Sequence, residues 1–345
     1  MLSKNLLGLG LVVATSLVGA AGRDTISVVG SSTVYPFSTV VAERFGKSTD
    51  FSTPKIESTG TGGGMKLFCA GVDIDTPDMS NASRRIKQSE LDMCKKNGVN
   101  EVTEVLIGFD GIVFSNAKMS PNVSMSRKEI YLALAREIPN PDGSESLIEN
   151  PYTTWNEINS ALPAKKIAVY GPPPTSGTRD AFVELVMEAG CSKYGWIKAM
   201  KKADKNKFKE MCHSVREDGA YIESGENDNL IVQKLTANPD SFGVFGFSFL
   251  DQNLDTLQGS KVDGAFPTFE AISDGSYPVS RPLYFYVKKA HVGKVPGILE
   301  FLTEFTSENA MGEEGYLTDR GLIPLNPEKL AEVRKSVLAL ENLTL

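Results

Sequence analysis

Near its start the chain reads TISVVGSSTVYPF over residues 25–37. The apolar residues 25–30 predict a buried strand, and the Ser/Thr-rich residues after them predict a turn. An amphipathic segment then covers residues 36–45, with Pro36 where the first turn of a helix tolerates a proline. The pattern therefore predicts a strand that leads into a helix through a polar loop.

The same alternation of strands and helices continues along the chain. A Gly-rich stretch, residues 59–64, opens a short helix that reaches Phe68, and Gly98 ends a helix over residues 89–97. Farther on, the sequence predicts strands over residues 102–114, 166–170, 243–249 and 283–287. It predicts helices over residues 178–189, ended by Gly190, and over 296–305. Capping boxes at Ser126 and Thr154 mark two further helix starts, with a loop over residues 138–151 between them. We therefore expect an α/β fold with mainly parallel sheets.

Length and charge restrict the class of protein. The chain has 345 residues, of which 41% are hydrophobic and 23% charged, as in globular proteins, and this length suits two lobes. Lys and Arg number 36 against 43 Asp and Glu, which gives a formal net charge of −7. Nucleic-acid-binding proteins usually have a basic surface, so the sequence argues against a nucleic-acid partner. Anion binding would need a local site.

Residues 1–21 have the pattern of a secretory signal peptide. Lys4 precedes an apolar run over residues 6–18, and small residues follow up to Ala21, where we expect cleavage. The alternatives are a buried hydrophobic helix or a membrane anchor, but a membrane span needs ~20 apolar residues and this run is shorter.

The chain contains four cysteines, Cys69, Cys94, Cys191 and Cys212. An even number in an exported protein favours disulfides. Three connectivities are possible, and proximity along the chain favours Cys69–Cys94 and Cys191–Cys212. There is no C-x-x-C spacing and the only histidines are His213 and His291, so the sequence predicts no metal site.

Four polar loops stand where a strand ends or a helix begins, at residues 31–34, 59–64, 81–84 and 175–180. Backbone N–H groups at such places are free to bind an anion, and hydroxyl groups add donors. Each loop alone is equally typical of an ordinary helix cap. Arg179 favours a bound anion, because a cation in the first turn of a helix opposes the helix dipole; Asp180 is the alternative counter-ion.

Five segments carry a resemblance to a known family: GSSTVYPF (residues 30–37), STGTGGGMK (58–66), DMSNASRRI (78–86), TSGTRDAF (175–182) and YPVSRPLYFYVK (277–288). Together, and in this order, they resemble the periplasmic phosphate-binding proteins of bacterial phosphate ABC importers. The resemblance implies a type II periplasmic-binding-protein fold, in which two lobes joined by two crossover strands close on the ligand. Lobe 1 would comprise residues 22–110 and 285–345, lobe 2 residues 111–284, and the crossings residues 107–116 and 282–288.

The resemblance also implies a set of phosphate ligands. Carried over position by position, lobe 1 supplies Ser32, Thr33, the backbone around Val34 and Tyr35, Thr61 and Ser83, and lobe 2 supplies Ser176, Gly177 and Thr178. Prolines occupy residues 172–174, where some family members have an arginine, so we expect the guanidinium from Arg84, Arg179 or both. Some members also have an aspartate in place of Ser83. The acceptor of the phosphate proton is therefore left open between Asp180 and Asp228, and Asp228 has the alternative role of capping a helix over residues 230–235.

The predicted function is capture of inorganic phosphate in the periplasm by a monomer, which delivers it to the membrane permease of an ABC importer. No catalytic residue, metal or cofactor is predicted. One alternative keeps the fold and changes the ligand to another tetrahedral oxyanion, such as sulfate, or to a phosphonate; an ionised acceptor in the site would repel sulfate. The other alternative, a secreted phosphatase or serine hydrolase, lacks the Asp/His clusters and the G-x-S-x-G motif that it would need.

Overall fold

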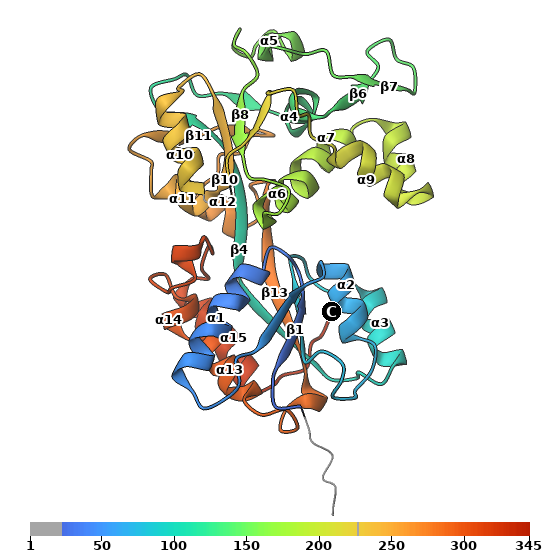
Figure 1. Ribbon diagram of the computed structural model, residues 1–345, viewed down its shortest axis with the longest axis vertical. Coiled ribbons are helices and arrows are strands. Elements are labelled where there is room, and N and C mark those ends of the chain that lie inside the picture. Colours follow the sequence, from blue (N-terminus) through green and yellow to red (C-terminus); the bar gives the residue numbers. More distant parts are fainter. Residues whose placement is uncertain (1–22, 226–227) are drawn as a thin grey trace, which may run out of the picture.

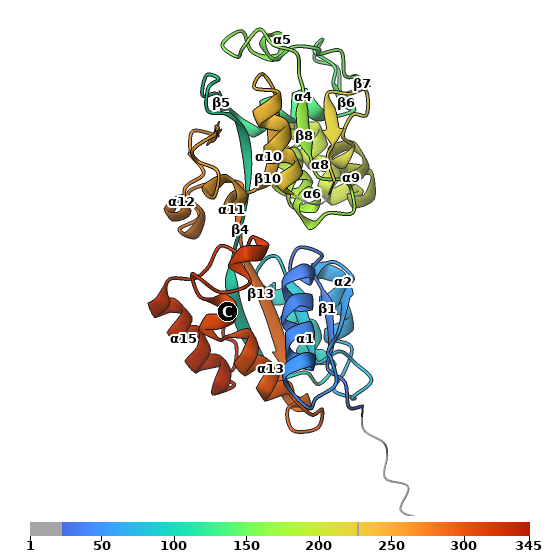
Figure 2. The same ribbon diagram turned by 60° about the vertical axis from the view of Figure 1, so that its left-hand side comes forward.

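The computed structural model describes residues 23–225 and 228–345, so the predicted signal peptide lies outside the described residues. The chain forms two lobes, which lie one above the other in Figure 1. Two long strands, β4 (Val102–Ala117) and β13 (Ser280–Lys288), join the lobes and pair antiparallel with each other. Figure 2 shows β4 passing from one lobe to the other in a second view. The predicted two-lobed α/β fold with two crossover strands is confirmed.

Lobe 1, the lower lobe in Figure 1, has a sheet in the order β2-β1-β3-β13-β4. Its remaining strands are β1 (Ser27–Gly30), β2 (Lys55–Ser58) and β3 (Met79–Ala82). Its helices are α1 (Tyr35–Ser48), α2 (Thr61–Phe68), α3 (Gln88–Lys96), α13 (Ile298–Phe305), α14 (Glu308–Met311) and α15 (Pro327–Leu338). The strand, loop and helix predicted at the start of the chain are confirmed as β1 and α1, with Pro36 in the first turn.

Lobe 2 continues the sheet in the order β4-β10-β8-β9. Its strands include β8 (Val169–Gly171), β9 (Tyr221–Glu223), β10 (Phe242–Gly246) and β11 (Leu257–Gly259), which also pairs with β4, and a small pair made by β5 (Ser124–Met125) and β12 (Lys261–Val262). Its helices include α4 (Arg127–Leu134), α5 (Trp155–Ile158), α6 (Gly177–Phe182), α7 (Glu188–Cys191), α8 (Gly195–Ala203), α9 (Lys205–His213), α10 (Asp228–Ala237), α11 (Phe247–Asp251) and α12 (Phe269–Ser273). The predicted capping boxes start α4 and α5.

Parallel pairing occurs within each lobe and antiparallel pairing at the crossings. β1 is parallel to β2 and β3, and β8 is parallel to β9 and β10. In this main sheet, the antiparallel pairs are those that β4 and β13 form with each other and with their neighbours. The loops that follow parallel strands therefore meet at the waist between the lobes.

Each lobe has its own hydrophobic core. In lobe 2, Trp155 packs edge-on against Phe114 and Phe242, and in lobe 1 Phe301 packs edge-on against Phe45. On β4, Ile107 packs in the lobe 1 core and Ile112 in the lobe 2 core. On the return crossing, Val279, just before β13, packs in the lobe 2 core and Leu283 in the lobe 1 core. We keep the lobe boundary at residues 110/111 as a proposal, and we move the second proposed boundary from residues 284/285 to a point before Leu283, because Leu283 packs in the lobe 1 core.

Three local predictions differ from the structure. The predicted strand over residues 243–249 ends at Gly246, where α11 begins, because a short apolar run suits a buried strand and a buried helix equally. The predicted loop over 138–151 contains a hairpin of β6 (Glu137–Pro139) and β7 (Leu147–Glu149). Gly190 does not end its helix: a Cβ there would lie 2.3 Å from the Arg127 carbonyl oxygen, so this glycine allows α7 to pack closely on α4.

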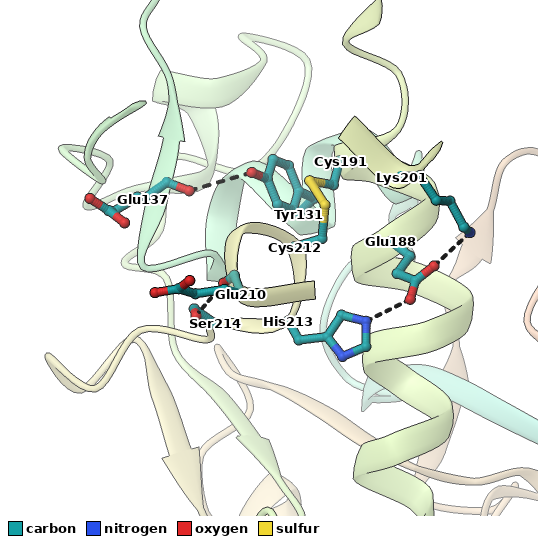
Figure 3. Close-up of a disulfide and its surroundings, with 9 residues drawn as sticks. All are labelled: Tyr131, Glu137, Glu188, Cys191, Lys201, Glu210, Cys212, His213 and Ser214. Carbon is teal, nitrogen blue, oxygen red and sulfur yellow. Dashed lines mark hydrogen bonds and ion pairs between the residues drawn. A yellow bond between two sulfur atoms is a disulfide. The ribbon is translucent and has the colours of Figure 1, made fainter. Parts of the chain in front are cut away.

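Both predicted disulfides are present, and no cysteine is free. Cys69–Cys94 ties the end of α2 to α3, and Cys191–Cys212 ties α7 to α9. Figure 3 shows the second disulfide beside His213, whose Nε2 lies 2.7 Å from Glu188 Oε1. Burial raises the pKa of Glu188, but the hydrogen bonds from His213 and Lys201 outweigh it and hold this pKa at about 2. An ionised Glu188 therefore links α7, α8 and α9.

Candidate anion-binding site

A cavity of about 950 Å³ lies between the lobes. Its lobe 1 wall comes from polar loop residues 31–33, 59–63 and 83–84, and its lobe 2 wall from Asp180, residues 183–185 and α9. A second cavity of about 930 Å³ shares Ser32 and Thr33 with the first and is lined by residues 175–178, Asp110 and Asp228. The structure thus brings the predicted loops of both lobes together around Ser32 and Thr33.

In lobe 1, hydroxyl groups form the cavity wall. The Ser83 N–H donates to Thr61 Oγ1 at 3.1 Å, and the two side-chain hydroxyls lie 3.2 Å apart. The Val34 side chain is fully buried, its N–H donates to Ser31 Oγ at 3.4 Å, and the Tyr35 N–H donates to the Ser31 carbonyl oxygen. These two N–H groups are therefore used within a turn. Ser32 and Thr33 line the cavity, whereas Val34 does not.

In lobe 2, Ser176 caps α6: its Oγ accepts from the Thr178 N–H at 3.2 Å. A Cβ on Gly177 would lie 3.0 Å from the Thr33 Cα, so the absence of a side chain allows the two loops to touch. Ser32 Oγ donates to Asp180 Oδ2 at 2.5 Å, across the waist. A carboxylate of lobe 2 therefore occupies a donor of lobe 1.

Arg281 on β13 is a site residue that the sequence reasoning missed. Its Nη2 donates to Thr33 Oγ1 at 2.6 Å, its Nη1 to Glu184 Oε2 at 2.8 Å and its Nε to Asp110 Oδ2 at 3.3 Å. The residue is 7% exposed and lines the first cavity. It stands inside the segment YPVSRPLYFYVK, where an arginine within an otherwise apolar strand was the available signal.

Two carboxylates, the buried Asp228 and the half-buried Asp110, lie beside the meeting point of the loops. Burial raises the pKa of Asp110, and the charge of Arg281 opposes that rise. Burial also raises the pKa of Asp228, to about 6, with a contribution from the charge of Asp110, while the Gly246 N–H, 2.9 Å from Asp228 Oδ2, lowers it. Asp228 is the first residue of α10 and lines the second cavity, so it stands both at a helix start and at the cleft.

The two arginines expected as ligands have different positions. Arg84 lines the first cavity, but its two Nη atoms bind both carboxylate oxygens of Glu90 at 2.7 and 2.9 Å. The guanidinium of Arg179 lies 4.4 Å from the centroid of the Tyr221 ring and donates to the Pro172 carbonyl oxygen at 3.3 Å. Arg179 lines neither of the two cavities that share Ser32 and Thr33, and no ion pair joins it to Asp180, although both residues are described. The buried cation at the meeting point is thus Arg281.

Within residues 23–225 and 228–345, no group of three or more His, Cys, Asp or Glu side chains is placed to hold a metal ion. None of the helices in this part of the chain has the length and apolar character needed to cross a membrane.

The fold and the site define a two-lobed α/β binding protein with polar loops from both lobes around one cleft. Residues 16–309 match the family model of the PBP superfamily domain. The chain is 30% identical to the phosphate-binding protein PstS of Staphylococcus saprophyticus, over 94% of this chain and 90% of the relative, and 31% identical to that of Staphylococcus aureus USA300, over 88% and 84%. The chain belongs to the PBP superfamily and, within it, to the family of the PstS phosphate-binding proteins. This is a family of binding proteins, which confirms the prediction that the chain is not an enzyme.

Solved structures agree with this assignment. A possible phosphate-binding protein from Planctomyces limnophilus is 26% identical and superposes with a TM-score of 0.70, over 91% of this chain and 97% of that one. An ABC-type phosphate transport receptor from Vibrio cholerae, 17% identical with a TM-score of 0.55 over 93% of this chain and all of that one, shares the fold.

Proposed function

We propose that this protein captures inorganic phosphate in the periplasm and delivers it to the membrane permease of an ABC importer. The observation that carries the proposal is Arg281, a buried cation at the point where hydroxyl-bearing loops from both lobes meet. In such a water-poor site, charge-assisted hydrogen bonds to an anion are stronger than at an exposed surface. The names of the PstS relatives support phosphate as the anion.

The proposed ligands come from both lobes. They are the hydroxyls of Ser32, Thr33, Thr61, Ser83, Ser176 and Thr178, the N–H groups around Gly177, and the guanidinium groups of Arg281 and Arg84, with Arg179 as a further candidate. Asp180 accepts a hydrogen bond from Ser32. An incoming phosphate would replace this carboxylate, and its contacts to both lobes would favour the closed form.

Asp228 supports selectivity for phosphate over sulfate. With a pKa of about 6, this carboxyl group is mostly ionised at neutral pH, although it is buried at the cleft. An ionised carboxylate accepts the proton of hydrogen phosphate and repels sulfate, which has no proton at this pH. We therefore assign proton acceptance to Asp228 rather than to Asp180, which already binds Ser32.

The remaining parts of the proposal concern the whole protein. Residues 1–21 act as a signal peptide that is cleaved near Ala21, and the mature protein works as a monomer. Each lobe presents one side of the closed cleft to the permease, so docking depends on closure.

Calorimetry with the mature, ligand-stripped protein tests the proposal. We expect phosphate to bind and sulfate to bind at least about 100-fold more weakly, a difference of about 2.7 kcal/mol. Equal affinities would contradict phosphate selectivity and favour a general oxyanion-binding protein, and tighter binding of a phosphonate would identify that ligand class instead. Hydrolysis of a phosphate ester that disappears in an Arg281→Met variant would overturn the assignment as a binding protein.

A further inference from the structure

The two cavities that share Ser32 and Thr33 differ in charge. The first is lined by four lysines, which we call the basic mouth: Lys66, Lys87, Lys205 and Lys209. The second is lined by one arginine, Arg320, and by four carboxylates, which we call the acidic mouth: Glu43, Asp110, Asp228 and Asp319. Ser32 and Thr33 are therefore reached through two cavities whose charged side chains are mainly of opposite sign.

The four lysines of the basic mouth leave the first cavity with an excess of positive charge. All four are exposed, and none forms an ion pair with another described residue. The carboxylates of this cavity already have partners: Glu90 binds Arg84, Glu184 binds Arg281, and Asp180 accepts from Ser32. The free charge at this mouth is therefore positive.

The basic mouth is built from both lobes. Lys66 is on α2, Lys87 directly precedes α3, and Lys205 and Lys209 are on α9. Figure 1 shows α2 and α3 of the lower lobe and α8 and α9 of the upper lobe on the same side of the molecule, opposite α1, α10 and α11. Because all four lysines line the first cavity, both lobes contribute to the same basic mouth.

A net charge of −7 would repel an anion at long range, but salt limits that repulsion to a Debye length of about 8 Å at physiological ionic strength. Within this distance, a cleft lined by one sign of charge concentrates the opposite ion. We propose that the basic mouth is the entry route for phosphate, and that its four lysines form an outer collecting site ahead of the inner site at Thr33 and Arg281. This inference rests on the proposed function.

The test is the rate of phosphate binding as a function of salt. A fluorophore on Leu230→Cys, an exposed position on α10 at the side of the acidic mouth, reports binding in a stopped-flow instrument. For the Lys205→Gln/Lys209→Gln variant we expect the association rate constant to fall about tenfold at low ionic strength and to approach that of the unsubstituted protein at high salt. The dissociation rate constant should change less than twofold, because these lysines are not inner-site ligands.

Lys198→Gln/Lys202→Gln is the matched control. It removes the same charge from the adjoining helix α8, at exposed positions that line neither cavity. We expect this variant to keep the original rate and salt dependence. Equal slowing of both variants would mean that only the net charge of the protein matters, and no slowing of either would mean that the basic mouth is not the entry route. Both results contradict the inference. They leave the proposed function intact if calorimetry shows phosphate binding. If calorimetry shows none, both proposals fall.

Discussion

Asp228→Asn should stabilise the ligand-free protein and weaken its binding of phosphate. Asp228 is 5% exposed. Its carboxylate accepts a hydrogen bond from the Gly246 N–H. An asparagine oxygen can accept the same hydrogen bond without a charge. The substitution therefore removes a buried negative charge and leaves the shape of the site in place.

The raised pKa gives the size and sign of the effect. A rise of the Asp228 pKa from 3.8 to about 6 corresponds to about 3 kcal/mol against the ionised folded state. Between about pH 4 and pH 6 the folded state binds more protons than the unfolded state, so stability falls as the pH rises. The penalty is complete above about pH 6 and absent below about pH 4. Asp228→Asn should therefore raise the free energy of unfolding by up to about 3 kcal/mol at pH 8 and by nothing at pH 4.

Urea unfolding at several pH values measures this difference, and calorimetry at pH 8 measures ligand binding. In the same variant we expect weaker phosphate binding and a smaller preference for phosphate over sulfate, because the proton acceptor is lost. A stability difference that does not depend on pH would refute the electrostatic reasoning. Unchanged selectivity would remove Asp228 from the site.

Other substitutions test the remaining contacts. Arg281→Met should lower the free energy of unfolding by about 2–3 kcal/mol, because it leaves the half-buried Asp110 without its charged hydrogen-bond partner, and Arg281→Lys should recover part of this loss in the same urea unfolding measurement. Thr178→Val should weaken phosphate binding about tenfold in calorimetry. Arg179→Ala should weaken it less, because the guanidinium of Arg179 lies on the Tyr221 ring. The reverse order of the two effects would mean that Arg179 moves into the site on closure. Cys191→Ser/Cys212→Ser should cost about 3 kcal/mol of stability, and an unchanged urea midpoint would contradict a structural role for this disulfide.

The local parts of the site were predictable because their signals lie within short stretches of the chain. Pro36, the hydroxyl-bearing loops and the capping serines mark helix starts whatever the rest of the fold does. The disulfide pairings followed from proximity along the chain, since each closes a short loop. Gly190 shows where such signals fail: a glycine that ends a helix and a glycine that admits a neighbouring helix look the same in a sequence.

The sequence by itself determined the alternation of strands and helices, the polar loops and the family. Only the tertiary structure decided which groups meet, because contacts between residues far apart depend on how the two lobes pack. Thr33 and Arg281 are 248 positions apart, and Ser32 and Asp180 are 148 apart, yet each pair forms a hydrogen bond at the waist. The same packing directs Arg179 to Tyr221 and places Arg281 in the cleft, and it gathers the four lysines of the basic mouth around one cavity and the four carboxylates of the acidic mouth around the other. A chain with a net negative charge thereby acquires a cluster of lysines beside the proposed anion site.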